Sequence, residues 1–159
     1  MGMYTELVFD TELSLEKLPE IEEVLRHMLG ESQEASYSSL SLHFQLPAAA
    51  LFKSSRWEYM LRGSSFYFNG ETHSELNVMT EYNIATLTVR CSLKNYSQEI
   101  EKFLDWIYSY DETDWHTDYA PRKMFKGYMR YEEDVHPTLI YFTKNGVEFV
   151  KTGEETERY

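Results

Sequence analysis

The segment "PTLIYFTKNGVEFVKTG", residues 137–153, decides the fold class. Two arms rich in β-branched and aromatic residues flank the dipeptide Asn145-Gly146. Asn-Gly between such arms is the strongest short-range signal for a tight two-residue turn, because that turn requires positive φ angles. The sequence therefore predicts a β-hairpin here, and an antiparallel sheet built around it.

Other stretches upstream of the hairpin also predict strands. In residues 83–93, alternate positions are apolar and share one face, which is typical of a half-buried strand. Residues 47–55 predict only a short helical turn. The remaining strand-like stretches are residues 3–9, 39–46, 56–62, 65–70, 75–81 and 122–132.

Two segments predict amphipathic helices. The first begins at Pro19, which suits a first helical position, and ends at Gly30, which suits a helix cap. The second has apolar residues at helical spacing from Ile100 to Tyr108. Strands in series with two helices predict an α+β fold. We expect a single, mainly antiparallel sheet of about seven to eight strands, with both helices packed on one face. Residues 1–153 would form one α+β domain, and residues 154–159 a flexible tail.

The net charge of −12 is concentrated in two segments. Residues 10–34 carry eight acids and two bases, and residues 97–120 carry seven acids and one base. Both predicted helices lie within these segments, so we expect an acidic helical side of the molecule. Such a surface repels nucleic-acid phosphates and membrane headgroups and attracts basic partners.

Several classes of function are excluded by residue counts and patterns. The single cysteine, Cys91, allows no intrachain disulfide and no zinc site with two thiolates from one chain. The seven glycines form no phosphate-binding pattern. The longest apolar run, residues 46–52, is far shorter than the ~20 residues of a membrane helix, and no Lys or Arg precedes Lys17 as in a secretory signal. We expect a cytoplasmic protein without a cofactor.

The loop "YDETDWHTDYAP", residues 110–121, has two interpretations. As a metal site it would combine its acids and histidine with the segment "EEDVH", residues 132–136. This alternative gives a metal-assisted hydrolase with the ligands His116, Asp118, Glu133 and His136. As a polar loop it is solvated or meets a partner. We favour the second interpretation, because no EF-hand spacing is present and acidic loops commonly follow helices.

The function that the charge pattern favours is a small acidic, non-enzymatic protein-binding module. Inhibitors, immunity-type proteins and DNA mimics pair their carboxylates with Lys and Arg of a basic surface. Trp115 is either a plug at the edge of the core or an anchor for the partner. The predicted contact residues are Glu99, Asp105, Asp111, Glu112, Asp114, Trp115, Asp118 and Tyr119.

Two other partner classes remain as alternatives. A single-stranded nucleic acid would use Lys126, Tyr128 and Arg130 on one face of a strand, but the net charge argues against it. A homo-oligomeric structural protein would make contacts between subunits through exposed aromatics. The residues considered for that role are Tyr128, Tyr131, Tyr141 and Phe149.

Overall fold

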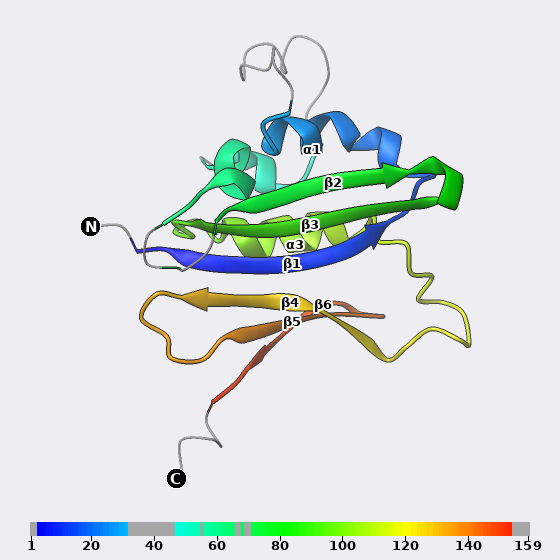
Figure 1. Cartoon of the computed structure of the whole chain (residues 1–159). Coiled ribbons are helices and arrows are strands. Elements are labelled where there is room, and N and C mark those ends of the chain that lie inside the picture. Colours follow the sequence, from blue (N-terminus) through cyan, green and yellow to red (C-terminus); the bar gives the residue numbers. More distant parts are fainter. Residues whose placement is uncertain (1–2, 32–46, 55, 66–67, 69–70, 154–159) are drawn as a thin grey trace.

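A computed structural model describes residues 3–31, 47–54, 56–65, 68 and 71–153. Its centre is a six-stranded antiparallel sheet with strand order β2-β3-β1-β4-β5-β6 (Figure 1). The α+β class is confirmed, with six strands described where seven to eight were expected. The predicted strand at residues 39–46 and most of the one at 65–70 lie outside the described residues. The strands are β1 (Thr5–Leu13), β2 (His73–Met79), β3 (Ile84–Leu93), β4 (Lys123–Tyr131), β5 (Thr138–Thr143) and β6 (Gly146–Lys151).

The predicted hairpin forms between β5 and β6, but its two turn residues are Lys144 and Asn145, because Thr143 pairs with Gly146. Gly146 has a φ of +119°, a conformation that favours glycine. In β3, alternate residues from Ala85 to Leu93 are buried, Cys91 among them. Burial raises the pKa of the Cys91 thiol, and the nearby Glu6 carboxylate raises it further. This cysteine is therefore a core residue and not a reactive thiolate.

Both helices cover the same face of the sheet (Figure 1). Helix α1 (Glu22–Met28) and helix α3 (Glu99–Tyr108) contribute to a single buried cluster that also contains the inward residues of β1 and β3. A short 3-10 helix, η1 (Leu18–Glu20), contains Pro19 and precedes α1, separated from it by Ile21. None of the described helices is long and apolar enough to cross a membrane.

The expected strand at residues 56–62 is wrong, because this segment forms the 3-10 helix η3 (Trp57–Arg62). An alternating strand would place Trp57, Tyr59 and Leu61 on one face. Instead Trp57, Met60 and Leu61 are buried, and Tyr59 is exposed. The predicted turn before it is present as η2 (Ala50–Lys53). Packing against β3 and α1 thus overrides the β propensity of these residues.

The expected acidic helical side is not formed. Arg26 pairs with Glu22 at 2.9 Å and with Glu31 at 2.6 Å on the surface of α1. The two 3-10 helices η2 and η3 add Lys53 and Arg62 to the same side. The charge of this side is therefore mixed, because bases from segments outside the acidic ones fold onto it.

A β-bulge in β4 shifts the strand register between Phe125 and Gly127. Tyr128 and Arg130 lie opposite Val8 and Glu6, on the face of the sheet away from the helices. The bulge sends Lys126 into the protein, where its side chain is buried. The three-residue platform considered for a single-stranded nucleic acid is therefore not formed.

Candidate functional site

The loop after α3 is anchored by a buried polar group. The Lys126 Nζ lies 3.2 Å from Asp111 Oδ1, and the two side chains are only 6% and 1% exposed. The Thr11 hydroxyl donates to the same carboxylate oxygen, and the backbone N–H of Thr113 donates to Oδ2 at 3.1 Å. Asp111 is therefore a structural residue that fixes the start of the loop, and it is not accessible to a partner.

Two more of the predicted contact residues are buried. Trp115 is 9% exposed and stacks on Tyr108 with ring centroids 6.4 Å apart, so it is a core-edge residue. Glu99 is fully buried at the start of α3, where its carboxylate accepts the backbone N–H of Ser97 at 3.0 Å. The exposed members of the predicted set are Asp105, Glu112, Asp114, Asp118 and Tyr119.

Exposed carboxylates from three segments lie at one end of the sheet, together with the exposed bases Arg122, Lys123 and Lys144. The antiparallel registers place the end of β1, the turn between β2 and β3, and the loop before β4 at this end. None of these carboxylates forms an ion pair with another described residue. We call this surface the acidic end and define it by Asp10, Glu12, Glu81, Glu112, Asp114 and Asp118.

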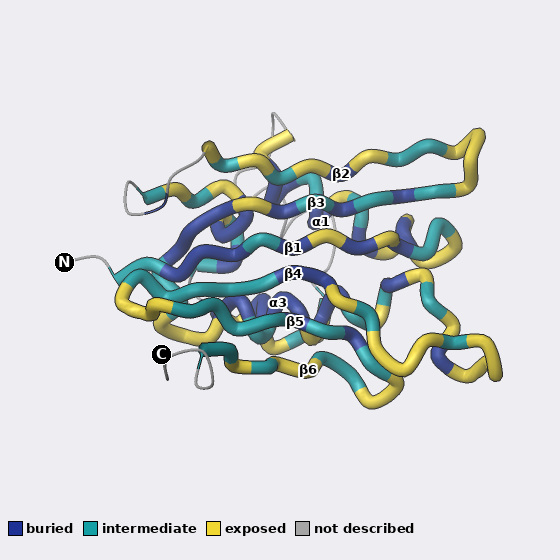
Figure 2. The backbone as a smooth tube through the Cα atoms, turned by 60° about the horizontal axis from the view of Figure 1, so that its bottom comes forward, coloured by how far each residue is buried: buried dark blue, intermediate teal, exposed yellow. Residues whose placement is uncertain are grey.

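Two exposed tyrosines lie on the same segments as these carboxylates. Tyr119 is 97% exposed, and Tyr82, in the turn between β2 and β3, is 68% exposed. Most of the loop is exposed (Figure 2). Its residues Trp115 and Asp111 are buried and anchor it. No local sequence pattern identifies Asp10, Glu12, Glu81 or Tyr82 as members of this surface, because only strand register brings them to this end.

At the acidic end, Glu12 and Glu112 are adjacent and border a hollow of about 410 Å³. A hydrogen bond between the two carboxyl groups raises the pKa of Glu112. Partial burial and the negative charges of Glu12 and Asp111 raise it further, and Lys126 opposes them. The pair therefore holds a proton more readily than a free glutamate does.

This pair makes stability depend on pH. A folded-state pKa above the unfolded value means that the folded protein binds more protons, so the contribution is favourable at low pH. This contribution to stability is lost as the pH rises from the ordinary pKa of glutamate through the raised pKa of Glu112. We expect Glu112→Gln to raise the melting temperature at pH 7 and to have little effect near pH 4. Melting curves of the wild type and Glu112→Gln between pH 4 and pH 7 test this expectation, with Asp118→Asn as a charge-matched control. A Glu112→Gln effect that is independent of pH would contradict this interpretation.

The residues of the metal alternative do not converge. His116 and Asp118 precede β4, whereas Glu133 and His136 follow it. The nine residues of β4 separate the two pairs by roughly 30 Å along the strand. In the part of the chain that the structure describes, no group of three or more His, Cys, Asp or Glu residues is placed to hold a metal ion.

The aromatics considered for subunit contacts also divide between surfaces. Tyr128 and Tyr141 belong to the face without helices, where Tyr141 meets Phe125 at 5.6 Å between ring centroids. Phe149 is paired with the buried Ile140, on the helical face of β6. Tyr131 lines a separate hollow. These four rings therefore do not form one surface.

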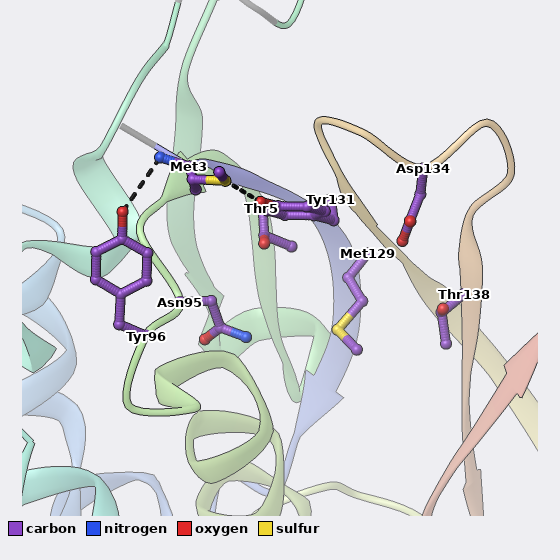
Figure 3. Close-up of a pocket in the computed structure, with 8 residues that line it drawn as sticks. All are labelled: Met3, Thr5, Asn95, Tyr96, Met129, Tyr131, Asp134 and Thr138. Carbon is purple, nitrogen blue, oxygen red and sulfur yellow. Dashed lines mark hydrogen bonds between the residues drawn. The ribbon is translucent and has the colours of Figure 1, made fainter. Parts of the chain in front are cut away.

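A second hollow, larger than the one beside Glu112, has a volume of about 530 Å³ and lies at the other end of the sheet (Figure 3). It lies between the segment that leads into α3 and the ends of β1, β4 and β5. Figure 3 shows side chains from all of these elements around it. No sequence motif predicts this hollow, because its lining residues come from separate segments of the chain. The lining residues are Met3, Thr5, Asn95, Tyr96, Met129, Tyr131, Asp134 and Thr138.

Comparisons with known proteins give no further assignment. No protein-family model matches the chain, and no curated protein or solved structure is significantly similar to it.

Proposed function

We propose that this chain is a small acidic protein-binding module that docks on a basic surface of another protein through the acidic end. The observation that carries this proposal is that six exposed carboxylates without ion-pair partners among the described residues belong to segments at the same end of the sheet. Carboxylates in this state attract Lys and Arg of a partner and accelerate encounter. An inhibitor, an immunity-type protein and a DNA mimic all act by this principle.

The anchoring of the loop supports the same proposal. Asp111 and Trp115 hold the loop to the core, so the exposed carboxylates between and after them need little ordering when a partner binds. Tyr119 adds a large, exposed amphipathic ring, a residue type that is enriched among binding hot spots. The surface thus combines charge for steering with one aromatic anchor.

The test compares two variants that lose the same charge. The loop variant is Glu112→Gln/Asp114→Asn/Asp118→Asn, and the control is Glu23→Gln/Glu71→Gln/Glu75→Gln, which changes exposed acids elsewhere. We expect the wild type and the control to capture a protein with a basic surface at 50 mM salt and to release it at 500 mM. For the purified partner, the loop variant should show an association rate about tenfold lower.

A second measurement separates the roles of charge and of the tyrosine. Tyr119→Ala should increase the dissociation rate and leave the association rate unchanged. The proposal is wrong if the loop variant binds the partner as well as the control does, or if binding is indifferent to salt.

A further inference from the structure

We propose that the 530 Å³ hollow beside the start of α3 is a binding site for a small organic cation with an apolar body, such as an arylalkylammonium ion. Sites for small molecules are hollows of roughly 300–1,000 Å³ with mostly apolar walls and a few polar groups. This hollow fits that description, with two thioethers, two phenol rings and one carboxylate. It lies away from the acidic end, so the inference does not depend on the proposed function.

The floor of the hollow is the helical face of the sheet. Thr5 is paired with Tyr131, and Met129 is paired with Thr138, across β1, β4 and β5. These positions continue the buried face of the strands: Thr5 is buried, whereas Met129, Tyr131 and Thr138 are only half-buried. Asn95 forms part of the opposite wall, and its side-chain oxygen caps α3 by accepting the N–H of Ile100 at 2.8 Å.

Hydrogen bonds connect the two aromatic side chains of the hollow. The backbone N–H of Met3 donates to the Tyr96 hydroxyl at 3.3 Å, and the Tyr131 hydroxyl donates to the Met3 thioether (Figure 3). The two phenol rings are thereby held through a shared neighbour. Such preorganisation reduces the ordering cost of binding a ligand.

The carboxylate is positioned by the turn between β4 and β5. The backbone N–H of Asp134 donates to the carbonyl of Tyr131 at 2.9 Å, which folds the turn back on the strand. In Figure 3 the side chain of Asp134 is directed toward the region between Met129 and Thr138. A cation in the hollow would therefore meet both an aromatic ring and a carboxylate.

The charges around the hollow favour a positive ligand. Among the residues that the structure describes, Asp134 is the only charged one in the lining, and the nearby Lys151 lines an adjoining hollow instead. Burial raises the pKa of the Tyr131 hydroxyl, and the carboxylates Glu133, Glu132 and Asp134 raise it further. The same negative field stabilises a cation, which also gains from contact with aromatic faces and polarisable thioethers.

Three probes of similar shape and different charge test the inference. They are 2-phenylethylammonium, neutral 2-phenylethanol and anionic 3-phenylpropionate, each titrated into protein with ¹³C-methyl methionine. We expect the Met129 methyl signal to shift with the cation, with an affinity about fivefold or more above that for the alcohol. The anion should not bind.

Matched variants distinguish charge recognition from hydrophobic contact. Asp134→Asn should weaken cation binding about three- to fivefold and leave alcohol binding unchanged. Tyr131→Leu should weaken cation binding about three- to thirtyfold. Asp114→Asn, at the acidic end, is the control and should have no effect. Equal binding of cation and alcohol, shifts confined to methionines outside the hollow, or equal loss of both ligands in Asp134→Asn would overturn the inference.

Discussion

The Gly127→Ala variant is expected to lose about 3–5 kcal/mol of unfolding free energy, the range of the most damaging single substitutions. A Cβ at this position would lie 1.9 Å from the carbonyl oxygen of Val8 and 2.8 Å from the Cα of Phe9. Both atoms are backbone atoms of the central strand β1, so no side-chain rotation relieves the clash. The φ of Gly127, +149°, is also unfavourable for alanine.

The control for this prediction is Gly146→Ala in the hairpin turn. Gly146 also has a positive φ, +119°, but a Cβ there would meet no atom within 4 Å. Only backbone strain is introduced, with a cost of about 1–3 kcal/mol. Urea denaturation of both variants at the same temperature measures the difference. If Gly127→Ala is no more damaging than Gly146→Ala, the close approach of β4 to β1 is not a determinant of the fold.

The Lys126→Met variant is expected to lose about 3–5 kcal/mol, because it leaves the Asp111 carboxylate buried without its cation. The Thr11 hydroxyl and the Thr113 N–H still donate to this carboxylate, but neither carries a neutralising charge. Urea denaturation of the variant and of the wild type under the same conditions measures the loss.

Two further variants test whether charge is the cause. Lys123→Met removes a lysine whose ion pair with Glu148, at 3.9 Å, is about half exposed, and it should cost under about 0.5 kcal/mol. The double variant Lys126→Met/Asp111→Asn removes both buried charges and should recover most of the lost stability. A double variant as unstable as Lys126→Met alone would assign the effect to packing of the lysine stem instead.

The elements that the sequence predicted correctly are those with strong local signals. The hairpin between β5 and β6 and the helix at Ile100–Tyr108 were both found, because turn chemistry and helical periodicity act over a few residues; the turn itself lies one residue earlier than Asn145-Gly146. The strand assigned to residues 56–62 failed, since its apolar residues fit either pattern and packing decided between them.

The candidate site was predicted less completely than the fold. Glu112, Asp114, Asp118 and Tyr119 are exposed as expected, whereas Trp115 is a core-edge residue. The acids from β1 and from the turn between β2 and β3 gave no signal, because they are far from the loop in sequence. The hollow at the other end of the sheet also gave no sequence signal, because its lining residues are far apart in the sequence.

By itself, the sequence determined the α+β class, the hairpin and the apolar faces of the two helices, because local spacing specifies these features. Only the tertiary structure decided which charged side chains are exposed at the surface and which are buried. The bulge at Lys126 reverses the face of one residue in β4, and that reversal pairs Lys126 with Asp111 inside the protein. A shift of one residue in a strand moves a side chain from one face to the other, and strand pairing sets that register across the whole sheet.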